Sequence, residues 1–367
     1  MCSYSIAMQD KEIYIRGRGA QSNPTNKFFK TEMVTNLDDL ATEQEREEAL
    51  NYNPKTKFIE VFPKTIVNKV DSPDLGLGYS INPYQGCEHG CVYCYARNSH
   101  QYWDYSAGRD FEQNILVKKS APALLRTFLQ NPKWEATSSI ILSGNTDCYQ
   151  PAERQFEITK QLLQIFYEFR HPVSIITKNS MIDRDIDLLA KMAELRLVHV
   201  VLSLTTLDED LKRILEPRTA SARNVLRTLR SLSSAGIPVS INAAPMIPAI
   251  NDMELHDIIQ AAAENGARRV NYIVVRLNGA IGGIFTDWVE KNFPDRANKV
   301  LNRIKSMHGG NLNDSQYGRR MRGEGEWADI IKLQYQVSMK KFFPNPQPFE
   351  YDTSLYAQYR DGQMKLF

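Results

Sequence analysis

Through the middle of the chain, short apolar runs of the kind that form buried strands alternate with segments whose apolar residues recur at helical spacing. Six of these runs are expected to be strands: residues 79–82, 138–143, 173–177, 198–204, 237–243 and 269–275. Helices are expected over residues 153–169, 183–194, 222–235 and 253–265. Strands that alternate with helices form a parallel sheet with right-handed crossovers, so the pattern predicts an α/β fold.

Two α/β architectures accommodate such units, an open partial β/α barrel and a doubly wound sheet. A doubly wound sheet would have a glycine-rich phosphate loop after its first strand, whereas a loop with three cysteines follows residues 79–82. We therefore expect a partial (β/α)6 barrel over residues 79–278. Residues 1–78 and 279–367 are expected to be extensions packed on this core, and the last residues are candidates for an exposed tail.

Composition and charge limit the class of protein further. The 367 residues include 45 Lys and Arg against 43 Asp and Glu, a formal net charge of +2, so bulk charge does not indicate a nucleic-acid binder. No apolar run approaches the roughly 18 residues of a membrane-spanning helix, and the first residues do not resemble a secretory signal. We expect a cytoplasmic protein with no membrane partner. Its odd number of cysteines, five, argues against a disulfide framework.

Three of the cysteines, Cys87, Cys91 and Cys94, lie within the eight-residue string CEHGCVYC. Thiolates at such short spacing are iron–sulfur ligands, because one loop can then wrap several corners of a cluster. A [4Fe–4S] cube held by three thiolates keeps one iron open for an outside ligand, as catalytic metal sites do. A zinc site is the alternative, and it would need a fourth ligand such as His89 or His100.

The string CEHGCVYC, with Tyr93 before the third cysteine, resembles the C-x3-C-x-aromatic-C signature of radical S-adenosylmethionine (SAM) enzymes. The wider string NPYQGC…CYAR is similar to the branch related to spore photoproduct lyase, whose members are often labelled DNA repair photolyase-like. The similarity runs from the segment RGRGA, residues 16–20, to the last residue. It implies a radical SAM barrel with a [4Fe–4S] cluster on Cys87, Cys91 and Cys94. It also implies SAM bound at the open iron and cleaved to a 5′-deoxyadenosyl radical, with an external electron donor of the flavodoxin or ferredoxin type.

The resemblance also suggests contacts to SAM from polar residues that follow strands. The candidates are Asn145, Thr146, Asp147, Lys178, Ser203, Arg218 and Asn242. The first three lie in a segment that resembles the family's contact to the SAM amino group. Lys178 and Ser203 would meet the carboxylate or ribose, Arg218 would clamp the carboxylate, and Asn242 would suit ribose and adenine. The alternatives are helix N-caps for Thr146, Asp147 and Ser203, and surface salt bridges for the two basic residues.

One position departs from the family pattern. Spore photoproduct lyase has a cysteine near the end of its second strand, in a Cys-Thr-Ser-Asp string, that returns a hydrogen atom to the product radical. Alignment on Asp147 places Gly144 at that position, and Cys148 lies four residues later. Either Cys148 is the catalytic hydrogen donor or the reaction differs. We favour the second interpretation and keep Cys148 as a candidate.

Local features indicate partners. Basic clusters occur over residues 212–230, at 319–322 and at Arg16 with Arg18; they suit the phosphates of DNA or RNA, although solvated helix faces explain them equally well. The terminal residues Gln363 to Phe367 resemble the pentapeptide that docks bacterial repair proteins on the sliding clamp. The sequence therefore predicts a radical SAM enzyme for repair or modification of nucleic acid. The alternatives are radical modification of a peptide or small molecule, and a non-catalytic iron–sulfur redox or binding module.

Overall fold

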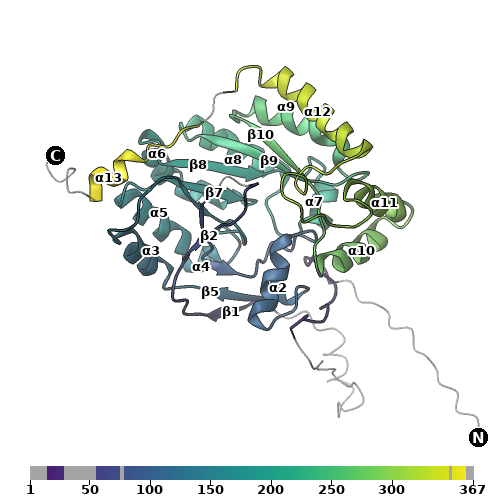
Figure 1. Ribbon diagram of the computed structural model, residues 1–367, viewed down its shortest axis with the longest axis horizontal. Helices are drawn as coiled ribbons and strands as arrows, with labels where there is room; N and C mark the ends of the chain where they lie inside the picture. The colour runs from purple at the N-terminus through teal and green to yellow at the C-terminus, as the bar shows by residue number, and fades with distance from the viewer. Residues whose placement is uncertain (1–14, 29–54, 75–77, 347–348, 361–367) are drawn as a thin grey trace, which may run out of the picture.

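The computed structural model describes residues 15–28, 55–74, 78–346 and 349–360 (Figure 1). The clamp-like pentapeptide and the charged stretch at residues 38–50, for which the sequence suggests a helix, lie outside these residues. Within the described part of the chain, no helix is both long and apolar enough to cross a membrane.

The main sheet has seven strands in the order β10-β9-β8-β7-β6-β3-β2. Their bounds are β2 (Val67–Lys69), β3 (Tyr79–Ile81), β6 (Ile140–Leu142), β7 (Val173–Thr177), β8 (Val198–Ser203), β9 (Val239–Met246) and β10 (Val270–Val274). The strands from β3 to β10 pair in parallel, and β2 is antiparallel to β3. These parallel strands are the six that the sequence predicts, and the α/β partial barrel is confirmed.

The crossover helices are α5 (Ile158–Glu168), α6 (Ile186–Glu194), α8 (Ala222–Ser234) and α9 (Leu255–Glu264). Shorter pieces precede them: α4 (Glu153–Phe156), η3 (Ser180–Asp185), α7 (Glu209–Leu215) and η4 (Asp252–Glu254). The helix expected over residues 153–169 is divided at Glu157, whose φ of 48° breaks it into α4 and α5. The buried carboxylate of Glu153 accepts hydrogen bonds from the N–H of Thr159 at 3.0 Å and of Lys160 at 3.4 Å, so it caps α5.

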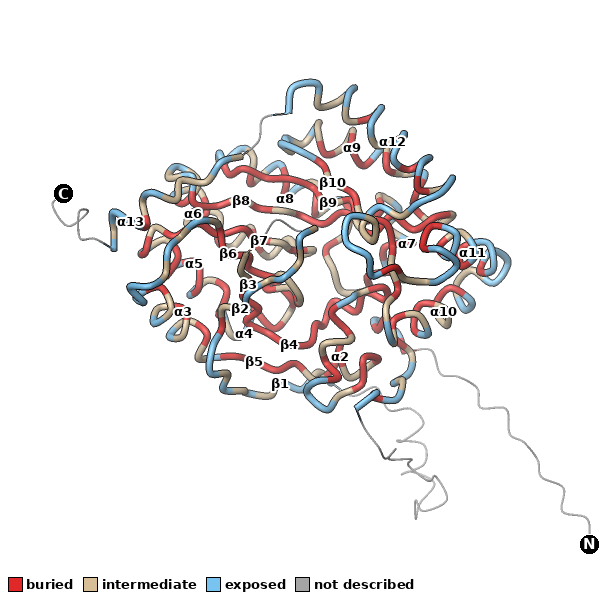
Figure 2. Tube along the Cα trace, in the orientation of Figure 1, coloured by how far each residue is buried: buried red, intermediate tan, exposed pale blue. Residues whose placement is uncertain are grey.

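The two faces of the sheet differ in what they bury. Val200, Leu202 and Ile241 are buried in the apolar core between the sheet and the helices. Alternate residues such as Val201 and Asn242 point to the opposite face and stay only half-buried. Figure 2 shows the buried residues concentrated along the strands and on the helix faces against them. The inner face of the partial barrel is therefore the accessible one.

A second, smaller sheet was not anticipated from the sequence. It has the order β1-β5-β4, with β1 (Lys57–Glu60), β4 (Tyr84–Gln85) and β5 (Asn114–Val117). Because β4 follows β3 after two residues, the chain leaves the main sheet just before the cysteines. The cysteine loop then leads into η2 (Tyr95–Trp103), and α2 (Asp110–Gln113) and α3 (Ala121–Leu129) flank β5.

The chain after the barrel forms α10 (Ile281–Asn292), α11 (Ala297–Met307), α12 (Glu326–Phe342) and α13 (Ser354–Arg360). The sequence also predicts a helix over residues 327–342, and α12 contains this segment. In Figure 1, α12 lies along α9 at the β10 edge, while α13 lies at the opposite side near α6. The Tyr356 hydroxyl donates to the carbonyl of Leu129 at 2.6 Å and so anchors α13 to the end of α3.

Candidate active site

The three clustered cysteines lie in a buried loop between β4 and η2. Cys87 and Cys91 are 6% and 5% exposed, and Cys94 is half-buried. The N–H of Cys87 donates to the carbonyl of Phe111 at 2.8 Å, which ties the start of the loop to α2. Gly86 and Gly90 have φ values of 83° and 70°, in the left-handed region that favours glycine, so the tight turns of the loop require them.

The chemistry of this donor set fits a multi-iron cluster. Burial raises the pKa of all three thiols. Asp147 and the neighbouring cysteines raise the pKa of Cys87 further, whereas Lys178 lowers the pKa of Cys91 and, with Arg97, that of Cys94. The three sulfurs therefore lie near one another and near cationic groups, which suits thiolate ligands. Among the described residues, no group of three or more His, Cys, Asp or Glu side chains is arranged to hold a single metal ion. Of the two proposed fourth ligands for zinc, His89 is engaged by Asp147 and Asn179, whereas His100 packs between two aromatic rings with no hydrogen-bond partner for its ring nitrogens.

The segment RGRGA at residues 16–20 packs directly against this loop. Arg97 donates from Nε to the carbonyl of Cys91 at 2.9 Å and pairs with Glu112 at 2.5 Å, both side chains being fully buried. The same Glu112 carboxylate accepts from the N–H of Gly19 at 3.1 Å and of Ala20 at 2.8 Å. One buried ion pair therefore holds the cysteine loop and the N-terminal segment together. Arg97 ends the motif CYAR, but the sequence assigns it no role and does not indicate its partner Glu112, which lies 15 residues later.

Arg18 of this segment is buried, which removes it from the predicted basic surface. It is 3% exposed and donates to the carbonyl of Glu112 at 2.7 Å. Arg218 lies beside the same segment: its Nε donates to the carbonyl of Gly17 at 3.1 Å, and its Nη1 lies 3.8 Å from Glu88. The salt-bridge alternative thus describes what the structure records for Arg218, and the predicted contact to the SAM carboxylate gains no support.

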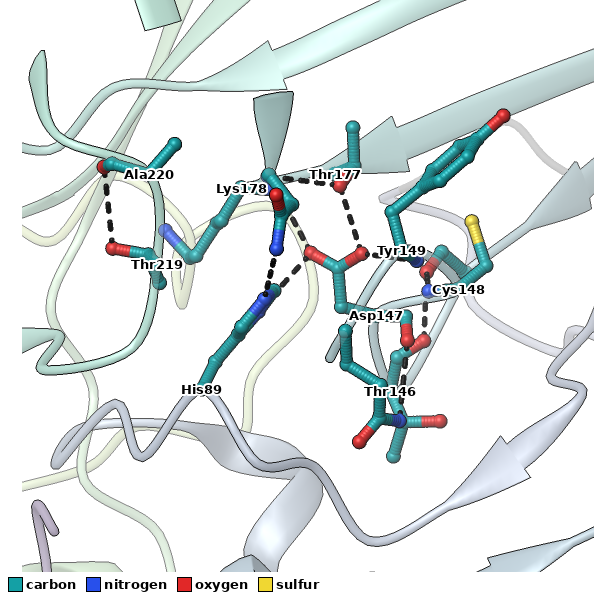
Figure 3. Close-up of polar contacts among 12 residues, drawn as sticks. His89, Thr146, Asp147, Cys148, Tyr149, Thr177, Lys178, Thr219 and Ala220 are labelled. Atoms are coloured by element: carbon teal, nitrogen blue, oxygen red, sulfur yellow. Dashed lines mark hydrogen bonds and ion pairs between the residues drawn. The ribbon is translucent and has the colours of Figure 1, made fainter. Parts of the chain in front are cut away.

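Asp147, a predicted SAM contact, has both carboxylate oxygens occupied by the protein. It accepts from the Thr177 hydroxyl at 2.8 Å and from the backbone N–H of Lys178 at 2.7 Å and of Tyr149 at 2.8 Å (Figure 3). His89 Nδ1 lies 3.4 Å from the same carboxylate. Asp147 therefore joins three parts of the site: the loop after β6, the end of β7 and the cysteine loop.

Thr146 and Asn145 differ in accessibility. The buried Thr146 hydroxyl donates to the carbonyl of Tyr84 at 2.5 Å, so it fixes the β6 loop to β4. Asn145 is half-buried, and its side-chain amide donates to the Ser99 hydroxyl at 3.0 Å. Of the three residues of this segment, Asn145 keeps the most polar surface for a ligand. Ser203 and Asn242 are register partners across β8 and β9, so the structure brings these two candidates together on the inner face.

Lys178 follows β7 and belongs to a buried charge network. Its ammonium donates to Glu216 at 3.0 Å, and Glu216 also accepts from Lys212 at 2.6 Å and from the Tyr93 hydroxyl. Burial lowers the pKa of Lys178, while the nearby thiols of the cysteine loop, Cys91 foremost, raise it. Lys178 is therefore not a surface salt bridge: its side chain is 17% exposed and lies beside the predicted cluster ligands. The sequence does not single out Glu216, because its partners Lys178 and Tyr93 are distant along the chain.

Tyr95, directly after the third cysteine, presents an accessible phenol. The residue is 48% exposed, and its hydroxyl donates to the carbonyl of Gly144. Burial nevertheless raises the pKa of Tyr95 to about 12, with Cys94 as a further cause. The bond to Gly144 places this phenol beside the loop after β6, at the carboxyl ends of the strands, where barrel enzymes hold substrates.

Cys148 lies in the apolar core, which favours the second of the two interpretations, a reaction in which Cys148 is not the hydrogen donor. Its side chain is completely buried and belongs to the apolar core under the helices. Its N–H donates to the Ser143 hydroxyl at 2.6 Å, and its carbonyl accepts from Thr159 at 2.7 Å. Figure 3 shows the sulfur directed away from His89 and Lys178. The position of Cys148 in the sequence could not predict its burial, because sequence spacing does not indicate on which face of the loop a side chain lies.

We expect Cys148→Ala to keep the rate of SAM cleavage within about twofold and to cost about 1–2 kcal/mol of stability, as removal of a buried sulfur creates a small cavity. The rate is measured as 5′-deoxyadenosine formed by the reduced protein, and the stability by denaturant unfolding. A folded Cys148→Ala protein that forms no more than about one 5′-deoxyadenosine per molecule would indicate that Cys148 takes part in the reaction.

Comparison with known proteins agrees with this geometry. Residues 81–262 match the Radical SAM superfamily. An uncharacterized protein of Mycobacterium tuberculosis is 32% identical over 254 residues, which are 68% of this chain and 73% of that protein. An uncharacterized protein of Methanocaldococcus jannaschii is 27% identical over 251 residues, 68% of this chain and 89% of that protein.

Among solved structures, spore photoproduct lyase complexed with dinucleoside spore photoproduct has a TM-score of 0.59 to this chain. The two are 17% identical, and the match covers 85% of this chain and 86% of that one, so what it shows is a shared fold. The matched family segment begins at Ile81, the last residue of β3, and contains the whole cysteine loop, Lys178 and Glu216. On its sequence, its fold and the cysteine loop at the carboxyl end of its first parallel strand, the chain belongs to the radical SAM superfamily of enzymes.

Proposed function

We propose that this radical SAM enzyme repairs or modifies nucleic acid, with a [4Fe–4S] cluster on Cys87, Cys91 and Cys94. The observation that carries the cofactor assignment is the buried loop of three thiols beside the Lys178 ammonium, at the carboxyl ends of the strands. With the cluster and SAM bound, an electron from an external flavodoxin or ferredoxin type donor would cleave SAM to methionine and the 5′-deoxyadenosyl radical.

The protein's own residues would then bind, orient and exclude water. Lys178 would meet the SAM carboxylate, since its ammonium lies beside the three thiols and is held by Glu216. Ser203 and Asn242, which are partners across β8 and β9, and the half-buried Asn145 would contact the rest of SAM. Asp147 and Thr146 would act indirectly, because their side chains hold the loop that carries Asn145.

Nucleic acid as substrate is supported by the fold shared with spore photoproduct lyase, which has been solved with a dinucleoside spore photoproduct. The predicted basic clusters add little support. Within them, Arg213 pairs with Asp210, Arg227 with Asp183 and Arg319 with Asp314. Lys212 is buried against Glu216. Contacts to phosphate must therefore come from other side chains.

The test is SAM cleavage by anaerobically reconstituted, dithionite-reduced protein, followed as 5′-deoxyadenosine. Turnover should rise at least several-fold when DNA or RNA is added and stay at its basal level with peptides; the Cys91→Ser variant serves as the blank. Stimulation by peptides alone would replace nucleic acid with a peptide substrate. An intact cluster with no product at all would favour a non-catalytic iron–sulfur module.

A further inference from the structure

The open side of the partial barrel is bridged at the carboxyl ends of its first and last parallel strands. Asn98, in the helix after the cysteine loop, donates to the carbonyl of Asn278 at 2.8 Å and accepts from the N–H of Ala280 at 3.1 Å. On the outer side, Asp74 accepts from the N–H of Gly318 and from Arg320, both at 2.6 Å. The segments flanking β3 and those following β10 therefore meet along a seam.

Arg276 lies in this seam, two residues after β10 ends and two before Asn278. It is near enough to the Tyr95 phenol on one side, and to Asp74 and Arg320 on the other, to interact with all three electrostatically. Tyr95 follows the third cluster cysteine. Arg276 is thus near both the end of the cysteine loop and the Asp74–Arg320 ion pair.

The guanidinium of Arg276 is half-buried and has no hydrogen bond or ion pair to any residue that the structure describes. Its neighbours are all engaged. Arg320 donates to Asp74 at 2.6 Å and to the Ser72 hydroxyl at 2.7 Å, and Arg322 donates to the carbonyl of Tyr272 at 2.7 Å. The nearby carboxylate is therefore already paired, and the seam carries excess positive charge. A partly desolvated guanidinium without a partner favours an anion that can accept its forked hydrogen bonds.

We propose that Arg276 binds a phosphodiester group of the substrate strand and so sets how far a nucleotide reaches toward the cysteine loop. This inference rests on the proposed function. An exposed ring supports a nucleotide over an acidic peptide: Tyr317 is 52% exposed and stacks against the Arg320 guanidinium at 4.4 Å. A nucleic-acid strand would offer both a phosphate for Arg276 and an unpaired base for the Tyr317 ring.

The inference is tested by binding of a fluorescent single-stranded oligodeoxynucleotide to the cluster-loaded protein, measured by anisotropy from 50 to 200 mM salt. Arg276→Ala should raise Kd about tenfold and reduce the slope of log K against log salt by about 0.7, the loss of one phosphate contact on a single strand. Arg276→Lys should keep the slope and bind with intermediate affinity, because the charge remains and the fork is lost.

The matched control is Arg196→Ala. Arg196 is an exposed arginine in the turn before β8, paired with Asp352 at 3.2 Å, at the opposite end of the strands. The Arg196→Ala substitution should leave both Kd and slope unchanged. If the wild-type protein binds the oligonucleotide and Arg276→Ala matches it in both quantities, the inference is overturned while the proposed function stands. If the wild-type protein binds neither DNA nor RNA, or binds acidic peptides instead, both are overturned.

Discussion

Cys91→Ser protein prepared without oxygen will lose most of its iron and acid-labile sulfide, and its formation of 5′-deoxyadenosine will fall at least a thousandfold. The serine hydroxyl is a poor ligand for a cluster that thiolates hold, and it would sit in a site where Cys91 is 5% exposed. The loop cannot move to supply another ligand, because Arg97 holds the Cys91 carbonyl at 2.9 Å. Iron and sulfide content and the electron paramagnetic resonance signal of the reduced protein measure the loss.

Cys148→Ala is the matched control for this experiment, since it removes a cysteine that is also buried but lies in the apolar core. It should retain its iron and its signal. Wild-type protein that carries zinc and no iron would contradict the cluster assignment, and so would a Cys91→Ser variant with full iron content. Either result would leave the assignment of the barrel fold unchanged, because the strands are stabilised by the apolar core between the sheet and the helices.

The parts of the fold that the sequence predicts are those encoded locally. β7 and β8 are short, mostly apolar segments rich in β-branched residues, so each can be identified from its own residues. The spacing of Cys87, Cys91 and Cys94 is local in the same sense. By contrast, β4 has two residues, and its ladder exists only because β5 lies alongside. No periodicity can mark a strand of that length.

The parts of the site that were missed depend on contacts between distant residues. Lys178 and Glu216 are 38 positions apart in the sequence. Arg276 interacts electrostatically with Tyr95, which lies on the other side of the seam. Polar residues after strands can be ranked from sequence as possible ligands, but their partners decide their role. Asp147 illustrates this, since four donors from the protein surround a carboxylate that the sequence assigns to SAM.

Gly19→Ala will impair assembly of the cluster although it lies 68 residues before Cys87. A Cβ at Gly19 would stand 2.9 Å from the carbonyl carbon of Gly90 and closer still to its oxygen. Both atoms are backbone, so no side chain can rotate to relieve the overlap, and overpacking of this kind costs about 1–3 kcal/mol. We expect the iron content to fall by at least half and the visible absorbance of the cluster to decay several-fold faster in air.

Gly283→Ala is the control, because a Cβ at that position in α10 meets no atom within 4 Å and should leave iron content and decay rate unchanged. A Gly19→Ala protein with full iron content and the wild-type rate of absorbance decay would show that packing of the N-terminal segment does not stabilise the cysteine loop. The expected loss of iron would show that it does. Since the superfamily match begins at residue 81, the cluster site would then depend on residues outside the shared segment, held through Glu112 and Arg97.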